Sequence, residues 1–253
     1  MRILILAAGY GTRLYPLTLD LPKSLVPIGN KPLMNFLIEK IYNLKKIFII
    51  EELTVVSNNK FYGYFLEWKK KYMVNANIMN DGSNSPQDRL GAVKDIKFAI
   101  GNKKDDWLVL GGDNLFEDDL VKFIELSYLK KPSPCIGLYD VADKKLASRY
   151  GVVKTDSRKK IVGFAEKPKN PFSTIIATCI YFFPKETLDF LDNFLSSETN
   201  TDAAGKYIAW LAKQTKVYGY TLKGNWLDIG QKDSLIEAER ISNEIMTFKT
   251  ESK

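Results

Sequence analysis

Short apolar runs and helix-like segments alternate along this chain from its first residues, and no other feature of the sequence restricts the fold as strongly. The opening run, residues 2–8, has the length and composition of a buried strand, and a loop rich in glycine and proline follows it to about residue 32. Three helix–strand pairs come next, with helices predicted at 34–46, 60–72 and 89–100 and strands at 53–57, 77–79 and 107–110. This alternation favours a mostly parallel sheet covered on both faces.

The second half of the chain contains longer strands and a hairpin signal. A polar turn at 156–159 joins two short strands, residues 151–155 and 160–165. The other elements predicted there are strands at 134–141, 174–183 and 217–222, helices at 185–195, 203–214 and 232–247, and a loop at 223–231. No linker, internal repeat or low-complexity tail divides the sequence. We therefore expect one domain over residues 1–253, an α/β, Rossmann-like three-layer sandwich with a mostly parallel mixed sheet.

The sequence contains no histidine, which removes several kinds of active site. Ser-His-Asp and Cys-His catalysis, His-ligated zinc and His general-base chemistry are all excluded. Any catalysis must therefore use Asp, Glu, Lys, Arg, backbone amides or a metal ion. The excess of 37 Lys and Arg over 30 Asp and Glu gives a net charge of +7. That charge suits a polyanionic ligand, and it equally suits a basic solvated surface.

The two cysteines and the hydropathy pattern indicate a cytoplasmic protein. Cys135 and Cys179 both lie in apolar runs, as buried free thiols do in a reducing compartment. The opening apolar run, residues 3–8, is too short for a signal peptide or a membrane span.

The loop after the first strand carries the strongest chemical signal. Gly9 and Gly11 permit a positive φ and allow successive backbone amides to turn toward an anion. Arg13 and Lys23 bring two cations to the same loop. A nucleoside triphosphate needs hydrogen-bond donors for its oxygens and cations for its charge, and this loop supplies both.

Two other phosphate-binding loops do not match this segment. A dinucleotide fingerprint requires a third glycine where Leu14 stands, and Pro16 interrupts the helix that should follow. A Walker loop requires Gly-Lys-Ser or Gly-Lys-Thr, which the loop does not contain. A dinucleotide-dependent oxidoreductase is therefore disfavoured.

Several motifs in a fixed order are similar to those of the sugar nucleotidyltransferase family. The loop reads Gly9-x-Gly-Thr-Arg-Leu-x-Pro-Leu-Thr and then Pro22-Lys-x-Leu-x-Pro27. Further matches follow along most of the chain: Lys31-Pro-Leu-Met, Gly111-Gly-Asp-Asn, Tyr150-Gly-Val-Val, Phe164-Ala-Glu-Lys-Pro168 and Trp226-Leu-Asp-Ile-Gly230. That family includes glucose-1-phosphate thymidylyltransferases and mannose-1-phosphate guanylyltransferases. The resemblance implies the nucleotide-diphospho-sugar transferase type of fold and Mg²⁺-dependent transfer of a nucleotidyl group to a sugar 1-phosphate, with release of pyrophosphate.

The resemblance also implies a role for the charged motif residues. Asp113 and Asp228 hold Mg²⁺ against the phosphates, and carboxylate oxygens suit that hard cation. Arg13 binds the pyrophosphate leaving group, and Lys23 binds the phosphates at the reacting centre. The sugar phosphate oxygen is already anionic near neutral pH, so no general base is needed and the missing histidine is no obstacle.

The remaining candidate residues divide between the two substrates. For the sugar phosphate, Lys167 is implied to bind the phosphate and Glu166 a hydroxyl, while Tyr150 and Gly151 offer a backbone amide. The residues expected at the nucleotide are Leu6, Ala7, Ala8, Gly9, Gly11, Thr12, Asn84 and Gly112. A nucleoside triphosphate and a sugar 1-phosphate are thus the expected partners, with no nucleic acid and no membrane, and a homo-oligomer stays open.

The sequence departs from the family pattern at the base loop, at the sugar pocket and near its end. In relatives that read thymine or uracil, a Gln precedes a Gly-Leu-Ala or Gly-Thr-Ala turn. Here Asn84 stands near the place of that Gln and Arg89 in the place of the turn glycine, and a pyrimidine is favoured over a purine. Thr178-Cys179 stands where Thr-Gly is common, which predicts a narrower sugar pocket. The left-handed β-helix domain of many relatives, with its acetyltransferase activity, is not expected.

Two functions remain open beside a sugar-1-phosphate nucleotidyltransferase. A non-catalytic relative that senses nucleotide sugars would keep the fold, but it would not need the complete set of charged motif residues, Arg13, Lys23, Asp113, Lys167 and Asp228. A cytidylyltransferase acting on another phosphorylated small molecule is suggested by the order Asp88-Arg89-Leu90. A nucleic-acid-binding domain would account for the net charge but for none of the ordered motifs.

Overall fold

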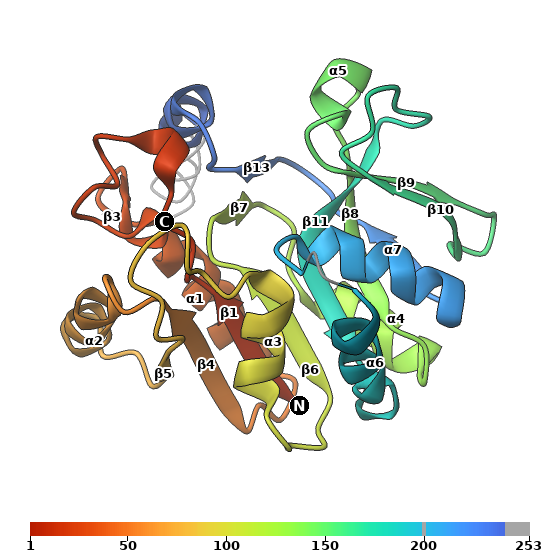
Figure 1. Ribbon diagram of the computed structural model, residues 1–253, viewed down its shortest axis with the longest axis horizontal. Helices are drawn as coiled ribbons and strands as arrows, with labels where there is room; N and C mark the ends of the chain where they lie inside the picture. The colour runs from red at the N-terminus through yellow and green to blue at the C-terminus, as the bar shows by residue number, and fades with distance from the viewer. Residues whose placement is uncertain (199–200, 241–253) are drawn as a thin grey trace, which may run out of the picture.

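The computed structural model describes residues 1–198 and 201–240. Within these residues a nine-stranded mixed sheet forms the centre of the molecule, and helices cover both of its faces (Figure 1). Four neighbouring strands are parallel: in spatial order, β6 (Trp107–Gly111), β1 (Arg2–Leu6), β4 (Glu52–Ser57) and β5 (Asn77–Asn80). These strands come from the first half of the chain, as the alternation of strands and helices predicts.

The second half of the chain extends the same sheet. β11 (Ile175–Phe183) lies antiparallel to β6 and to β8 (Cys135–Asp140), and β12 (Tyr218–Thr221) is parallel to β8. The predicted hairpin, β9 (Gly151–Thr155) and β10 (Ile161–Glu166), joins β11 through β9. Because β10 and β11 alone among these strands run against the rest, the sheet is mixed but mostly parallel.

Two sets of helices cover the two faces of the sheet (Figure 1). On one face lie α1 (Leu33–Leu44), α2 (Tyr62–Lys71) and α4 (Val121–Lys130), and on the other α3 (Ala92–Ile100), α6 (Asp189–Ser197) and α7 (Ala204–Gln214). Ile3 and Ile5 of β1 pack toward the first set, and Leu4 packs toward the second. Both faces of β1 are therefore buried, which explains its unbroken apolar run. Among residues 1–198 and 201–240, none of the helices has the length and apolar character needed to cross a membrane.

Short elements complete the fold beyond the carboxyl ends of the parallel strands. β7 (Asn114–Phe116) pairs antiparallel with β13 (Trp226–Asp228). The other short elements are η1 (Thr12–Leu14), η2 (Lys23–Leu25), β2 (Pro27–Ile28), β3 (Lys31–Pro32) and α5 (Lys144–Ala147). A further 3₁₀ turn, η3 (Lys185–Thr187), lies at the opposite edge of the sheet, where the amide of Lys185 donates to Asp106 before β6. Residues 232–240 are helical, and the rest of the helix predicted at 232–247 lies outside the described residues.

The observed elements differ from the sequence expectations in several places. α3 begins at Ala92 rather than at residue 89, because Gly91 precedes it with a φ of 89°, which no helix contains. The predicted loop at 223–231 includes β13, whose partner β7 is distant in sequence. The helix predicted at 185–195 opens as the 3₁₀ turn η3, and α6 starts at Asp189. The helix α4 was not predicted.

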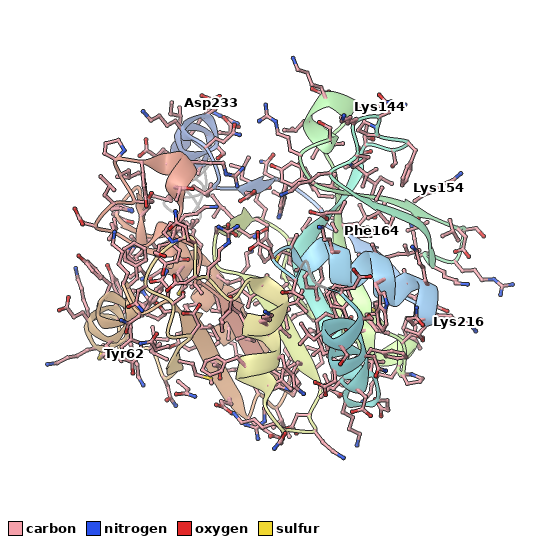
Figure 2. All side chains as sticks on the ribbon, viewed as in Figure 1. Tyr62, Lys144, Lys154, Phe164, Lys216 and Asp233 are labelled. Atoms are coloured by element: carbon pink, nitrogen blue, oxygen red, sulfur yellow. The ribbon has the colours of Figure 1, made fainter. Side chains whose placement is uncertain are left out.

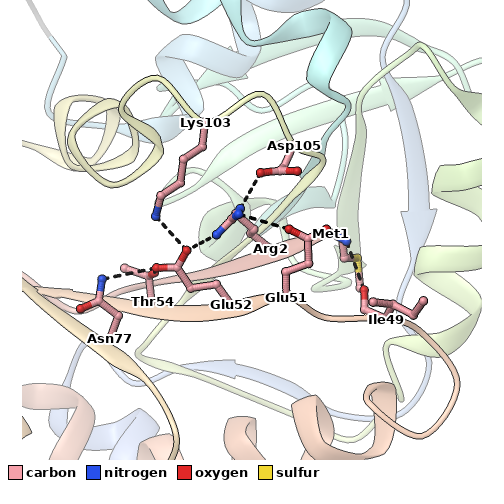
Figure 3. Close-up of polar contacts among 9 residues, drawn as sticks. All are labelled: Met1, Arg2, Ile49, Glu51, Glu52, Thr54, Asn77, Lys103 and Asp105. Carbon is pink, nitrogen blue, oxygen red and sulfur yellow. Dashed lines mark hydrogen bonds and ion pairs between the residues drawn. The ribbon is translucent and has the colours of Figure 1, made fainter.

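An ion-pair network lies at the amino ends of β1 and β4 (Figure 3). Arg2 pairs with Glu51, Glu52 and Asp105, and Lys103 pairs with Glu52 at 2.8 Å. Asp105 first, and then Glu52, raise the pKa of Arg2 against the effect of burial. Charge at this edge of the sheet is therefore neutralised within the protein, whereas the candidate residues follow the opposite, carboxyl ends of the strands.

Gly91 offers a test of the geometry before α3. A Cβ at this position would lie 2.7 Å from the Cα of Asp202, and its φ of 89° disfavours any L side chain. Gly91→Ala is expected to lower the free energy of unfolding by about 2–4 kcal/mol, measured by urea denaturation. Gly63 in α2 is the matched control, because a Cβ there meets no atom within 4 Å. Gly63→Ala should raise the free energy of unfolding by about 0.5 kcal/mol. Wild-type stability of the Gly91 variant would contradict the observed conformation.

Candidate active site

Lys23 lies between the carboxylates of Asp113 and Asp228. Its Nζ is 2.6 Å from Asp113 Oδ2 and 3.4 Å from Asp228 Oδ1. Lys23 begins η2, Asp113 follows β6 and Asp228 ends β13, so three distant segments meet at this point. Asp228 reaches Asp113 because β13 pairs with β7, in which Asn114 faces Asp228.

Burial and charge act in opposite directions in this group. Burial alone would lower the pKa of the Lys23 ammonium, but Asp113 and Asp228 outweigh burial and raise it. Burial would raise the pKa of Asp113, yet the adjacent ammonium holds that pKa below its ordinary value. The pKa of Asp228 is raised, because this carboxyl is buried, lies near Asp113 and is farther from Lys23. Two carboxylates thus share one ammonium, which leaves the group attractive to a further cation.

Asn114 and Trp226 fix the backbone that carries the two carboxylates. Trp226 Nε1 donates to Asn114 Oδ1 at 2.7 Å, and Asn114 Nδ2 donates to Asp113 Oδ1 at 3.0 Å. The amide of Ile229 donates to the carbonyl of Asp113 at 3.0 Å. The sequence analysis gave Asn114 and Trp226 no role, and their places beside Asp113 and Asp228 in the motifs were the available signal.

The carboxylates of Asp113 and Asp228 suit a magnesium ion. Mg²⁺ is usually bound by one or two carboxylates together with phosphate oxygens and waters. Asp113 and Asp228 already converge on one cationic atom, Lys23 Nζ. Within the described residues, no group of three or more His, Cys, Asp or Glu side chains is placed to hold a metal. The two carboxylates therefore fit Mg²⁺ in the manner that the ion adopts with a phosphate substrate.

A cavity of about 780 Å³ opens beside these carboxylates. The predicted residues that line it are Arg13, Asp113, Tyr150, Gly151, Glu166, Lys167 and Asp228. Leu146 of α5 and Asp233 of the last described helix also line it. In Figure 2 the labelled side chains Asp233 and Lys144, the latter on α5, mark these two elements. The structure thus brings the residues expected for the metal, the leaving group and the sugar phosphate to one cavity.

Glu166 ends β10, and its carboxylate packs against the backbone of Gly205 in α7. A Cβ on Gly205 would overlap this carboxylate, and a Cβ on Gly151 would lie 3.1 Å from it. Burial raises the pKa of Glu166, against the opposing charges of Lys167 and Lys206. The carboxylate accepts no hydrogen bond within the described residues. Its oxygens are therefore open to the hydroxyl donors of a ligand.

Lys167 and Cys179 line the same cavity in left-handed backbone conformations, with φ of 47° and 55°. The amide of Lys167 donates to the carbonyl of Tyr150 at 3.0 Å, which fixes the turn after β10. At Cys179 a left-handed φ favours glycine, and the thiol fills space that a glycine would leave. The narrower sugar pocket expected from Thr178-Cys179 stays a prediction. Burial raises the pKa of Cys179 to about 12, so the thiol is neutral.

The glycine loop presents a run of backbone amides. Within the described residues, the amides of residues 9–12 donate to no acceptor. Gly11 has a φ of 63°, and its carbonyl accepts a hydrogen bond from Thr18 Oγ1 at 2.8 Å. Successive amides in a left-handed turn form an anion-binding concavity. Thr12 at the end of this run is exposed.

Other residues predicted at the nucleotide use their backbone groups to join strands. The carbonyl of Leu6 accepts from the amide of Gly112 at 2.9 Å, and the amide of Ala7 donates to the carbonyl of Val56. The carbonyl of Ala8 accepts from Asn58 Nδ2 at 2.9 Å. Asn58, which the sequence analysis did not single out, thereby anchors the start of the glycine loop. Leu6, Ala7, Ala8, Gly9, Gly11, Thr12, Lys23 and Gly112 lie outside the lining of the cavity.

Asn84 also lies outside the lining of the cavity, on an exposed loop. Its Oδ1 accepts a hydrogen bond from Asn59 at 2.7 Å, and its Nδ2 donates to the carbonyl of Gly82 at 3.1 Å. Gly91, two residues after Arg89, adopts a positive φ of 89° directly before α3. Arg89 instead pairs with Asp202 through two hydrogen bonds of 2.8 Å.

The sequence matches the family model described as nucleotidyl transferase over residues 2–244. The chain belongs to the nucleotidyl transferase family. It is 33% identical over 242 residues to the bifunctional protein GlmU of Methanocaldococcus jannaschii, a match that covers 95% of this chain and 54% of that protein. It is 30% identical over 257 residues to the UTP–glucose-1-phosphate uridylyltransferase of Synechocystis, covering 97% of this chain and 64% of that protein. The chain spans about half the length of the GlmU proteins it matches.

A solved structure of apo UDP-glucose pyrophosphorylase has the same fold. It matches this nucleotidyl transferase with a TM-score of 0.77 and covers 97% of this chain and 98% of its own. The sequence identity is 21%, so this likeness concerns the fold. The predicted α/β sandwich with a mostly parallel mixed sheet is thereby confirmed.

The two carboxylates can be tested by removing their charge. Asp113→Asn and Asp228→Asn keep the shape of each side chain, but a neutral amide is a poorer ligand for a hard cation. Each variant is expected to lower turnover by more than about 10²-fold and to require more Mg²⁺, measured over a Mg²⁺ titration with the fold checked by circular dichroism. Asp189→Asn, on the exposed first turn of α6, is the charge-matched control and should keep wild-type turnover. Near-wild-type activity of either variant at limiting Mg²⁺ would show that the carboxylate is not a ligand.

Proposed function

We propose that this nucleotidyl transferase transfers a nucleotidyl group from a nucleoside triphosphate to a sugar 1-phosphate in the cytoplasm, with Mg²⁺, and releases pyrophosphate. The observation that carries the proposal is the single cavity that Arg13, Asp113, Asp228, Glu166 and Lys167 line together. The reaction involves two phosphate substrates, and this cavity combines cations for phosphates with the partly buried carboxylate of Glu166 for a hydroxyl. The printed name of the Synechocystis relative, a glucose-1-phosphate uridylyltransferase, supports the same reaction.

The proposed reaction requires alignment and neutralised charge. An anionic oxygen of the sugar phosphate attacks the α-phosphorus of the triphosphate and forms a new P–O bond. The bond from the α-phosphorus to the bridging oxygen breaks, and pyrophosphate leaves with the electron pair. Mg²⁺ bound by Asp113 and Asp228 supplies positive charge beside the phosphates. Arg13 binds the departing pyrophosphate, and Lys23 binds the phosphates at the reacting centre.

The proposal assigns the two substrates to different elements. The unpaired amides of residues 9–12 bind triphosphate oxygens. Lys167 binds the phosphate of the sugar phosphate, and Glu166 accepts a hydrogen bond from a sugar hydroxyl. Tyr150 and Gly151 offer the sugar a backbone amide at the start of β9, where the Phe164 ring leaves no room for a Cβ on Gly151.

The base is assigned to the loop of residues 83–89. Asn84 offers one acceptor and two donors to a base edge, which suits a pyrimidine. Its Oδ1 accepts from Asn59, which follows β4, and its Nδ2 donates to the carbonyl of Gly82, so the side chain is held in place before a base arrives. The uridylyltransferase name of the Synechocystis relative supports a pyrimidine.

A substrate panel tests the proposed function. Pyrophosphate release is measured with UTP, dTTP, CTP, GTP and ATP, each combined with glucose, N-acetylglucosamine or mannose 1-phosphate. Release that requires both substrates and favours one pyrimidine triphosphate is the expected result. Binding without release would identify a sensor of nucleotide sugars. If no sugar 1-phosphate reacts, but CTP reacts with another phosphorylated small molecule, the protein is a cytidylyltransferase for that acceptor. A preference for GTP or ATP would overturn the assignment of Asn84 and leave the catalytic assignment in place.

The role of Lys167 can be tested by measuring the KM of each substrate after Lys167 is replaced. Lys167→Ala is expected to raise the KM for the sugar phosphate about 10- to 100-fold, because it removes one charged hydrogen bond. The KM for the triphosphate should change by less than about threefold. Lys154, an exposed residue of β9 on the same hairpin (Figure 2), is the matched control. A larger rise in the KM for the triphosphate would assign Lys167 to the nucleotide instead.

A further inference from the structure

Asp81 and Asp95 form a buried pair of carboxyl groups beneath the loop that follows β5. Asp95 lies in the first turn of α3 and is 6% exposed. Asp81 Oδ2 and Asp95 Oδ1 are both buried, and within the described residues neither has a conventional hydrogen-bond partner. In addition to burial, Asp81 acts on Asp95 both through its charge and through a side-chain hydrogen bond, and both effects raise the pKa of Asp95. Two carboxyl groups can share a hydrogen bond only when one of them carries a proton.

Among residues 1–198 and 201–240, no basic side chain neutralises this pair. The charged groups that face Asp95 are Asp81, from the loop, and Asp202, from the segment before α7. Arg89 pairs with Asp202 and not with Asp95. In the part of the chain that the structure describes, neither Asp81 nor Asp95 forms an ion pair with a lysine or arginine. Burial first, then Asp81 and Asp202, raise the pKa of Asp95 to about 7.

Ser83 connects this pair to the glycine loop. Its amide and its hydroxyl donate to Asp81 Oδ1 at 2.7 and 2.8 Å. Its Oγ accepts a hydrogen bond from the Tyr10 hydroxyl at 3.3 Å. Tyr10 stands between Gly9 and Gly11, and Asn84 follows Ser83 directly. A continuous chain of hydrogen bonds thus leads from α3 to both loops assigned to the nucleotide.

We propose that Asp95 is a positioning residue for the nucleoside triphosphate. A proton shared between Asp95 and Asp81 holds residues 81–84, and with them Tyr10, in the arrangement that binds the triphosphate. This inference rests on the proposed function, because that function assigns both loops to the nucleotide. When the proton leaves, two adjacent buried carboxylates repel each other and the 81–84 segment separates from α3. Triphosphate affinity then falls, while the sugar phosphate cavity is unchanged.

The test compares the pH dependence of triphosphate affinity in matched variants. The Kd values of UTP, dTTP, CTP, GTP and ATP are measured by calorimetry, and the tightest-binding triphosphate is followed from about pH 6 to about pH 9. Wild-type Kd should rise up to about tenfold per pH unit above pH 7, because only the protonated pair is competent. Asp95→Asn keeps a donor for Asp81 but cannot titrate, so its Kd should lack this rise. The triphosphate itself also titrates, but this affects the wild type and Asp95→Asn equally, so the difference between their Kd profiles reports on Asp95.

Two further variants separate positioning from a general loss of structure. Asp189→Asn changes one exposed charge and should keep the wild-type pH profile. Asp95→Ala removes the donor and leaves Asp81 Oδ2 buried without a partner, so its Kd should be high at every pH, like that of the wild type at high pH. Rescue by Asn but not by Ala would identify the hydrogen bond to Asp81 as the effective contact.

Stability provides a readout that needs no substrate. The pKa of Asp95 is higher in the folded protein than in the unfolded chain, so its contribution is complete below about pH 4 and is lost as the pH rises toward 7. The urea midpoint of the wild type should therefore fall more over this window than that of Asp95→Asn. A wild-type Kd that is flat with pH, or an Asp95→Asn profile equal to that of the wild type, would overturn the inference even if turnover is observed. A pH-dependent Kd without turnover would support it and reject the proposed function.

Discussion

The ammonium of Lys23, held between Asp113 and Asp228, is the interaction on which the candidate site depends. Two partly buried carboxylates this close would repel each other without a cation. Their desolvation offsets most of the Coulomb attraction, so the ion pairs contribute little net stability. Their consequence is positional. They join η2, the end of β6 and the end of β13. They also hold the two carboxylates side by side, where a divalent cation can bind both of them together with phosphate oxygens.

The two edges of the parallel sheet carry charge in different ways. At the amino edge, Arg2 is surrounded by carboxylates from three other positions, and these charges are satisfied within the protein. At the carboxyl edge, the amides of residues 9–12 and the carboxylate of Glu166 have no partner within the described residues. Folding therefore leaves the hydrogen-bonding capacity at one edge unused, and α/β proteins bind ligands at that edge.

Local sequence pattern predicted much of this arrangement and missed what depends on distant pairing. The apolar runs located β1, β4 and β6, because strands buried on both faces lack polar residues. The antiparallel pairing of β7 with β13 involves three residues on each strand, and segments this short have no periodicity to detect. The start of α3 was placed too early, because Gly91 has a positive φ and lies so near the backbone of Asp202 that a Cβ would not fit. Neither the β7–β13 pairing nor that contact can be read from neighbouring residues.

The sequence pattern did not predict the role proposed for Asp95. The pair that Asp95 forms with Asp81 can also be compared with the pair of Asp113 and Asp228. Val93, Ile96, Ala99 and Ile100 of α3 are buried, so Asp95 lies on a helix that is otherwise anchored by apolar side chains. A carboxylate is costly in such surroundings, and the carboxyl group is retained at lower cost when it is protonated. Asp113 and Asp228 meet the same difficulty with a lysine. One acidic pair is thus compensated by a fixed cation and, in our proposal, the other by an exchangeable proton. In that proposal the second compensation is lost when a proton leaves, whereas the raised pKa of Lys23 keeps the cation that compensates the first pair.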